Sequence, residues 1–273
     1  MNFKADLHTH TTHSDGWLSV ESLLRRAILQ KLDVLAITDH DTVSGYIEAL
    51  DKNKKYGIKL VPGIELSAQY ENYEVHVLGY WFDPSNPDLN AYSETLKLDR
   101  YQRCERIVEN LRNAGHDISM DDVKYECKGD FFGRPHIAKA LIRKKIARNF
   151  THAFKEFLGN NSTSYEKKFF ITPADAIALI HKAGGIAVLA HPGYLNDTSL
   201  DIILQEKFDA IEAIHPSHTL PQQQKLIGIA KQLGIPWSGG SDFHGGTSTE
   251  RGYIGSYYLS REEFAAVESL KKM

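Results

Sequence analysis

Short apolar runs that end in histidine, aspartate or glutamate recur along this chain of 273 residues. The first runs through Asp6-Leu7-His8-Thr9-His10, and the next, Val34–Thr38, leads into Asp39 and His40. Later runs end at Glu65, His191, His215 and Asp242. Runs without polar alternation are typical of strands buried on both faces of a parallel sheet. Helical segments separate them, so the sequence predicts an α/β fold of repeated strand–helix units.

The number of runs, seven or eight, suggests that the sheet closes into a barrel. Functional residues of such barrels lie on loops at the C-terminal ends of the strands. The histidine, aspartate and glutamate residues that end the apolar runs lie at such strand ends. His76 differs, because it lies inside its run, Glu74–Tyr80. We expect Tyr253–Leu259 to form the last strand.

The middle of the chain has a different, mainly helical pattern, in which Ser119 and Asp122 form a capping pair. Residues 83–170 carry 16 Lys and Arg against 13 Asp and Glu, while the rest carries 16 against 22. We predict a barrel formed by residues 1–82 and 171–273, with a helical insertion, 83–170, over its mouth as a substrate cap. Its basic excess suits a small anionic substrate better than a long duplex.

Composition excludes several classes of protein. The formal net charge of −3 argues against general coating of nucleic acid, which needs a strong basic excess. Cys104 and Cys127 lie in no CxxC-type pattern, so we expect neither a thiolate zinc site nor a disulfide framework. The N-terminus has no apolar leader, and no apolar run reaches 18 residues. We expect a cytoplasmic protein without membrane contact, and infer no obligate protein partner.

The pair His8 and His10 indicates a metal site. Residues two apart on a strand project from one face, and two imidazoles there suit a divalent transition metal. The pair alone is weak evidence, but further metal-binding residue types end the later runs. We expect Asp6 and Asp39 to accept hydrogen bonds from ligand imidazoles. Asp41 is expected to cap the helix that follows it.

Eight motifs resemble those of the PHP (polymerase and histidinol phosphatase) family. They are Asp6-x-His8-x-His10, Ser14-Asp15-Gly16, Thr38-Asp39-His40-Asp41, Pro62-Gly63-Ile64-Glu65, His76-x-Leu78-Gly79, Gly133-Arg134-Pro135-His136, Ala190-His191-Pro192-Gly193 and Gly239-Gly240-Ser241-Asp242-Phe243-His244. Within the family the chain looks most like stand-alone members with a helical insertion. Those members act as 3′,5′-nucleoside bisphosphate phosphatases and, in some cases, as 5′→3′ exoribonucleases on short RNA.

This resemblance implies a distorted (β/α)7 barrel with a site for three divalent ions. One ion would bind His8, His10, Glu65 and Asp242. A second would share Glu65 and bind His76 and His191. The third would bind Asp15, His40 and His244. Imidazole and carboxylate ligands suit Mn, Fe and Zn alike, so ligand type does not choose among them.

The chemistry implied is hydrolysis of a phosphate ester by a hydroxide that bridges the metals. Asp15 and His40 would belong to the catalytic set with Arg134 and His218. Arg134 opens a helix, where a cation opposes the macrodipole, which hints at a bidentate grip on phosphate. His218 would assist or donate a proton to the leaving group. The expected substrate-binding residues are Arg134, His136, Ser217 and His218, although for His136 and His215 a structural role stays equally open.

We therefore expect a metal-dependent phosphatase or phosphodiesterase acting on a small anionic nucleotide. The leading substrate is a 3′,5′-nucleoside bisphosphate, cleaved to the nucleoside 5′-monophosphate and phosphate. Alternatives are 5′→3′ exoribonuclease action on short RNA and hydrolysis of histidinol phosphate. A deaminase or amidase barrel also begins with His-x-His, but it would need another ligand order. The non-enzyme alternative is a metal-binding regulatory module.

Overall fold

The computed structural model describes residues 3–127, 129, 131–245 and 253–271. The chain forms two compact units, one of Met1–Ala91 with Phe170–Met273 and the other of Tyr92–Phe169. The second unit lies within the segment predicted to be an insertion. The role of that segment as a substrate cap stays a prediction.

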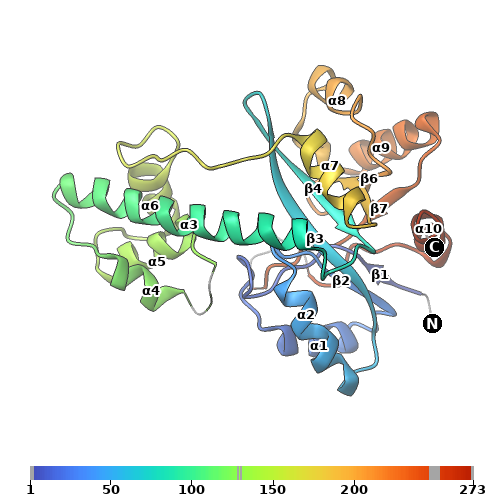
Figure 1. The fold of residues 1–273 in the computed structure, drawn as a ribbon, viewed down its shortest axis with the longest axis horizontal. Coiled ribbons are helices and arrows are strands. Elements are labelled where there is room, and N and C mark those ends of the chain that lie inside the picture. Colours follow the sequence, from blue (N-terminus) through green and yellow to red (C-terminus); the bar gives the residue numbers. More distant parts are fainter. Residues whose placement is uncertain (1–2, 128, 130, 246–252, 272–273) are drawn as a thin grey trace. The chain divides into compact units, whose positions relative to one another are not determined.

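A seven-stranded sheet, with its strands in chain order, forms the centre of the first unit. Its strands are β1 (Ala5–Asp6), β2 (Val34–Ile37), β3 (Lys59–Tyr70), β4 (Tyr73–Tyr80), β5 (Ile186–Leu189), β6 (Ala210–Ile214) and β7 (Trp237–Gly239) (Figure 1). At the seam, the Leu7 amide donates to the Gly239 carbonyl at 3.3 Å, and Thr9 forms a parallel bridge with Phe243. These contacts join the first and last strands, and the predicted distorted α/β barrel is confirmed.

One strand corrects the prediction of a wholly parallel sheet, because β4 is antiparallel to both β3 and β5. Tyr70 pairs with Tyr73, so only two residues join β3 to β4. Such a short turn can join only antiparallel strands, whereas parallel neighbours need a long crossover. The reversal brings the beginning of β4 to the end of the sheet where the parallel strands finish.

The last predicted strand is also wrong. In Tyr253–Leu259 only Leu259 makes a β-bridge, antiparallel to Ala5. The backbone turns at Gly255, whose φ is +73°, and the Gly255 amide donates to the Asp6 carboxylate. A side-chain acceptor thus replaces the sheet partner that a strand would need.

Helices flank the sheet (Figure 1). Those of the first unit are α1 (Val20–Leu29), α2 (Ser44–Lys52), α7 (Pro173–Lys182), α8 (Asp197–Ile203), α9 (Leu220–Leu233) and α10 (Arg261–Glu268), with short 3₁₀ turns at Asn53–Lys55 (η1) and Pro192–Tyr194 (η3). Local sequence fixes several starts, since Ser19 caps α1 and reciprocal capping boxes open α7 and α10.

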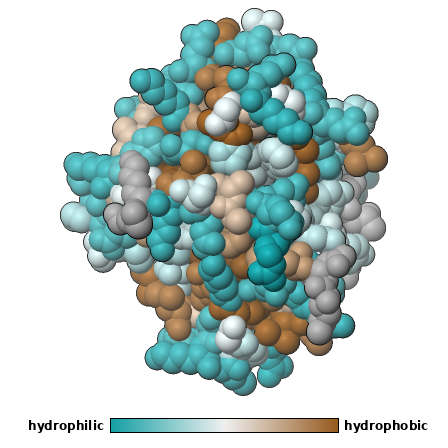
Figure 2. Space-filling model, turned by 90° about the vertical axis from the view of Figure 1, so that its right-hand side faces the viewer, coloured by the Kyte–Doolittle hydropathy of each residue, from teal (hydrophilic) through white to brown (hydrophobic). Residues whose placement is uncertain are grey.

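Two apolar clusters lie in the described part of the first unit. One lies inside the barrel and includes Leu7, Leu78 and Val188. The other packs α1 and α2 against β2 and includes Leu24 and Leu35. On the face shown in Figure 2, hydrophilic side chains separate smaller groups of hydrophobic ones. The barrel therefore has a buried apolar core between its strands and helices.

The second unit is helical, as predicted. Its elements are most of α3 (Pro87–Asn113), then α4 (Met120–Glu126), α5 (Arg134–Arg143), α6 (Phe150–Ala153) and one π-helical turn, η2 (Phe154–Leu158). The predicted capping box of Ser119 and Asp122 opens α4. The unit has an apolar cluster of its own, which includes Ile107, Ile137 and Leu141. In the described part of the chain, no helix combines the length and apolarity needed to span a bilayer.

Candidate metal centre

The barrel gathers all nine predicted ligands at one end of its sheet. His8, His10 and Asp15 follow β1, His40 follows β2, and Glu65 lies within β3. His191 follows β5, while Asp242 and His244 follow β7. Their donor atoms form overlapping groups within 4.8 Å of one another, which are His10/Asp15/His40/His244, His8/Glu65/His191, His8/His10/Asp242 and His40/Glu65/His76. A fifth group joins His8 to Glu212 and His215, which are not among the nine.

The antiparallel direction of β4 explains how His76 reaches the cluster. From the sequence, His76 lay inside an apolar run and not at the C-terminal end of a strand. Because β4 runs antiparallel, a residue near its start is level with the C-terminal ends of its neighbours. His76 pairs with Ser67 of β3, and its carbonyl accepts from the amide of Ala190, one residue before His191. The His76 ring therefore reaches the cluster from the middle of a sequence run.

Glu65 is the hub of the cluster and is 1% exposed. Its Oε1 lies 2.9 Å from His76 Nδ1 and 3.0 Å from His191 Nε2. Its Oε2 lies 3.3 Å from one nitrogen each of His8, His10 and His40. One carboxylate thus faces five imidazoles, as expected for a ligand shared between ions.

Four atoms at this hub are buried and have no hydrogen-bond partner among the described residues. They are His8 Nε2, His10 Nε2, His40 Nδ1 and Glu65 Oε2. Buried polar atoms without partners are rare and costly in folded proteins. Four of them facing one another are the arrangement expected around a bound cation, and imidazole with carboxylate is a donor set that fits Mn, Fe or Zn.

Hydrogen bonds behind the cluster fix which ring nitrogen faces it. His8 Nδ1 lies 2.9 Å from a carboxylate oxygen of Glu212, which leaves Nε2 for the cluster. His10 Nδ1 lies 3.5 Å from Ser14 Oγ. His244 Nδ1 donates to the Asp242 carbonyl at 2.8 Å, so its Nε2 faces Asp15 at 3.1 Å. These contacts set the orientation of the three rings toward the cluster.

Glu212 is a functional residue that the sequence analysis missed. It is fully buried in β6, and its second oxygen accepts from the His191 backbone amide at 2.8 Å. One carboxylate therefore positions two predicted ligands. The available signal was a single Glu inside the otherwise apolar strand Ala210–Ile214, because a lone buried carboxylate needs partners.

The charges of the cluster are mutually compensated in the absence of metal. Burial opposes ionisation of Glu65, but His40, His76 and His8 hold the pKa of its carboxyl well below the usual value. Burial likewise opposes the charged form of His10, yet Asp242 and Glu65 raise its pKa to about 10. The proton on His10 would have to leave before that imidazole could bind a divalent cation.

Two of the predicted ligands have a strained backbone conformation. His191 and Asp242 have φ values of +30° and +48°, in the left-handed region that side chains other than glycine rarely adopt. Strained backbone of this kind persists where surrounding contacts enforce it, and it gathers at functional sites.

Three aspartates beside the ligands act differently from their prediction. Asp6 accepts from the backbone amides of Ser241 and Gly255, and not from an imidazole. Asp39 accepts from the Thr11 amide and from Ser14 Oγ, so it reaches His10 only through that serine. These carboxylates therefore hold the backbone of the loops that carry predicted ligands.

Asp41 is not the predicted helix cap. Its carboxylate accepts from the amide and hydroxyl of Ser67 on β3, and its own backbone has a φ of +58°. The N-cap of α2 is Val43, which makes no side-chain capping bond. Asp41 therefore ties the loop after β2 to the strand that carries Glu65.

The predicted substrate-binding residues lie in two places. Ser217 and His218 belong to the loop after β6, where Ser217 bonds His215 Nδ1. His218 Nδ1 donates to the Ala213 carbonyl, and its Nε2 accepts from the Gly193 amide at 3.0 Å. This bonding ties the loop to Gly193, the second residue after His191. The predicted catalytic and substrate roles of Ser217 and His218 stay predictions.

Arg134 and His136 lie in the second unit, in the first turn of α5. Arg134 Nη1 donates to the Leu158 carbonyl and to Asn160 Oδ1, and the guanidinium lies over the Phe154 ring. The hydrogen bonds seen for Arg134 in the described residues all use Nη1, which leaves Nε and Nη2 as donors for a ligand.

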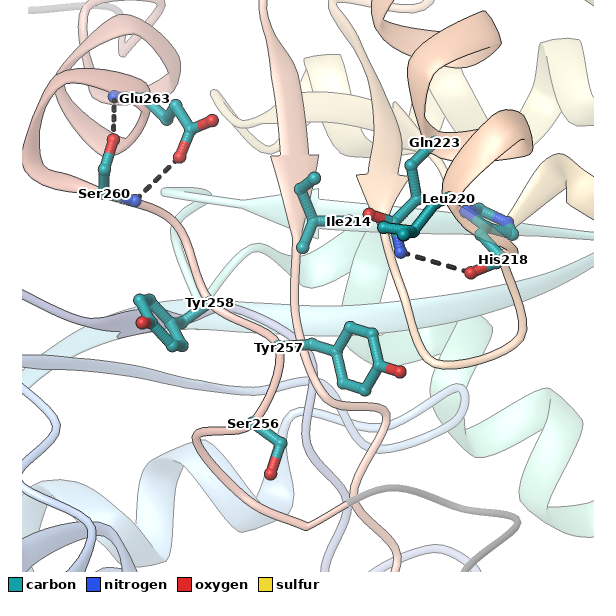
Figure 3. A pocket seen from close by; sticks show the side chains of 9 residues that line it. All are labelled: Ile214, His218, Leu220, Gln223, Ser256, Tyr257, Tyr258, Ser260 and Glu263. Carbon is teal, nitrogen blue, oxygen red and sulfur yellow. Dashed lines mark hydrogen bonds between the residues drawn. The ribbon is translucent and has the colours of Figure 1, made fainter.

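A pocket of about 480 Å³ lies beside the loop after β6 (Figure 3). It is lined by Ile214, His218, Leu220, Gln223, Ser256, Tyr257, Tyr258, Ser260 and Glu263. Its lining includes none of the nine predicted ligands, and Ser260 and Glu263 bond each other in the α10 capping box. The pocket is therefore distinct from the metal cluster, although His218 borders it.

Comparison with known proteins agrees with this geometry. A family model described as the PHP domain matches residues 6–213. The "5′-3′ exoribonuclease" of Haemophilus influenzae is 36% identical over 250 residues, covering 89% of this chain and 91% of the relative. The "3′,5′-nucleoside bisphosphate phosphatase" of Chromobacterium violaceum is 30% identical over 247 residues, covering 88% and 86%.

A solved structure matches over nearly its whole length. It is described as a putative metal-dependent phosphoesterase from Bifidobacterium adolescentis, with a TM-score of 0.87 and 29% identity, covering 98% of this chain and 96% of that one. Together with the clusters of His, Asp and Glu, these findings give the class of enzyme. The chain belongs to the PHP domain family and is a metal-dependent phosphoesterase.

Proposed function

We propose that the nine clustered residues bind three divalent ions and that the protein hydrolyses a phosphomonoester of a small nucleotide. The observation that carries this proposal is the set of four buried, unpartnered atoms around Glu65. The overlapping groups of donor atoms support more than one ion, because His8, His10, His40 and Glu65 each belong to two or more groups. Mn, Fe and Zn remain the candidates.

When bound, the ions would acidify water for attack on phosphorus and neutralise the phosphoryl oxygens. The residues of the chain position those ions. Glu212 holds the His8 ring and the His191 backbone, and the Asp242 carbonyl holds His244. Asp15 and His40, which belong to the group with His10 and His244, would complete the site of the third ion.

The leading substrate is a 3′,5′-nucleoside bisphosphate. The Chromobacterium violaceum relative named for this activity aligns over most of both chains, which supports the assignment. In the second unit, Arg134 has guanidinium donors left for an anion, and we assign it the grip on a substrate phosphate. His136, in the same helical turn, is a second candidate for phosphate contact.

A second candidate is 5′→3′ exoribonuclease action on short RNA. It is favoured by the Haemophilus influenzae relative, whose identity to this chain is 36%. Both reactions break a phosphate ester, so the cluster alone does not choose between them.

Steady-state kinetics of Mn-loaded protein on a substrate panel tests the proposal. The panel contains adenosine 3′,5′-bisphosphate, AMP, histidinol phosphate and short 5′-phosphorylated RNA. We expect the highest kcat/KM with the bisphosphate and loss of turnover in Asp15→Ala. The exposed variant Glu262→Gln serves as the matched control. A higher kcat/KM for RNA would replace the leading substrate with the second candidate, and preference for histidinol phosphate would reject both.

A further inference from the structure

His215 is a buried histidine beside the cluster that the ligand set does not use. It is 3% exposed and follows β6 directly. Its ring centroid lies 5.0 Å from that of His191 and 5.8 Å from that of His8. A seventh imidazole, in addition to the six of the ligand set, therefore borders the proposed metal site.

The bonding of His215 fixes its tautomer. The Ser217 backbone amide donates to His215 Nδ1 at 3.1 Å, and Ser217 Oγ lies 2.7 Å from the same nitrogen. A backbone N–H can only donate, so Nδ1 must offer its lone pair. A neutral ring then carries its proton on Nε2.

The Nε2–H points at the cluster and lacks a partner. His215 Nε2 is buried and makes no hydrogen bond among the described residues. Its nearest charged neighbour is Asp242 Oδ2 at 3.5 Å, beyond a good hydrogen bond. A buried donor without an acceptor costs free energy, so its retention here indicates an acceptor that arrives with the ligand.

We propose that His215 Nε2–H donates a hydrogen bond to a phosphoryl oxygen of the substrate bound at the cluster. This inference rests on one part of the proposed function, namely that the substrate places a phosphate at the cluster. A role as metal ligand would need the proton on Nδ1, where it would oppose the Ser217 amide. His215 is thus a phosphate donor beside the ions and not a further ligand to them.

Two variants separate the two ring nitrogens. The amide of His215→Gln lies near the position of Nε2 and can still donate, whereas that of His215→Asn lies near Nδ1 and cannot reach the phosphate. We would measure the metal content of both variants by mass spectrometry and the binding of inorganic phosphate to Mn-loaded protein by calorimetry. We expect full metal content in both, phosphate binding weakened roughly tenfold or more in His215→Asn, and most of the affinity kept in His215→Gln.

Two results would overturn the assignment. Loss of one ion in both variants would make His215 a ligand, and unchanged phosphate affinity in His215→Asn would make it structural. Nitrogen-15 NMR of the metal-free wild type gives an independent readout, in which protonation of Nδ1 instead of Nε2 also contradicts the proposal. Phosphate binding needs no turnover, so a protein that binds phosphate through His215 but cleaves none of the nucleotides would reject the proposed substrate alone.

Discussion

Replacing Glu212 by glutamine should weaken metal binding while leaving the fold intact. Glu212 accepts from His8 Nδ1 at 2.9 Å and from the His191 amide at 2.8 Å, in a fully buried position. Glutamine has nearly the same volume but only one acceptor. Its amide NH₂ must therefore face one of these two donors, and one hydrogen bond is lost.

The size of the effect follows from that single lost contact. A hydrogen bond to a charged group contributes about 1.5–3 kcal/mol, which corresponds to roughly a tenfold to hundredfold change in affinity. Loss of a partner behind a ligand histidine typically weakens metal binding by about the same factor. The loss of affinity should affect the ions that bind His8 and His191.

Chelator competition with Mn²⁺ measures the dissociation constant of each variant, and circular dichroism checks the fold. Glu262→Gln, on the exposed side of α10, removes the same charge without a ligand contact and should bind metal like the wild type. If Glu212→Gln also binds Mn²⁺ with wild-type affinity, the carboxylate does not position the ligands, and its burial needs another explanation.

Three further outcomes are expected. Arg134→Ala should lower kcat/KM for the bisphosphate by roughly ten- to a hundredfold at full metal occupancy, with Arg134→Lys recovering only part; a change below about twofold would remove Arg134 from the site. Burial raises the pKa of the Cys104 thiol to about 12, so iodoacetamide at pH 8 should label Cys104 only after denaturation. In metal-free protein, burial would lower the pKa of His10, but Asp242 and Glu65 raise it to about 10, above the unfolded value of 6.5. Its protonation therefore stabilises the fold fully below pH 6.5, and this stabilisation should decline as the pH rises toward 10. Urea titrations at several pH values measure the free energy of unfolding, and they should show no such decline in metal-loaded protein.

The positions of most predicted ligands could be inferred from sequence because strand ends are readable in this chain. An apolar run buried on both faces must stop where polar side chains begin, and parallel strands bring those stops together. His8, His40 and His191 were located in this way. The capping box at α4 was also predicted, since its residues, Ser119 and Asp122, lie only three positions apart.

The features missed depend on contacts between residues distant in sequence. The pattern of Glu74–Tyr80 does not reveal strand direction, so the approach of His76 became clear only with the β3–β4 pairing. Asp41 looks like a helix cap locally, yet its carboxylate bonds Ser67, 26 residues away. Glu212 meets His8 across 204 residues of sequence. A single sequence gives no distance between such pairs.

Metal content measured together with Asp15→Ala tests the central claim most directly. The account predicts about three divalent ions per chain in wild-type protein purified without chelator and loaded with Mn²⁺. It predicts about two in Asp15→Ala, because Asp15 belongs to the group with His10, His40 and His244 and not to the groups around Glu65. One ion per chain in the loaded wild type, or an unchanged number in Asp15→Ala, would contradict the three-ion site.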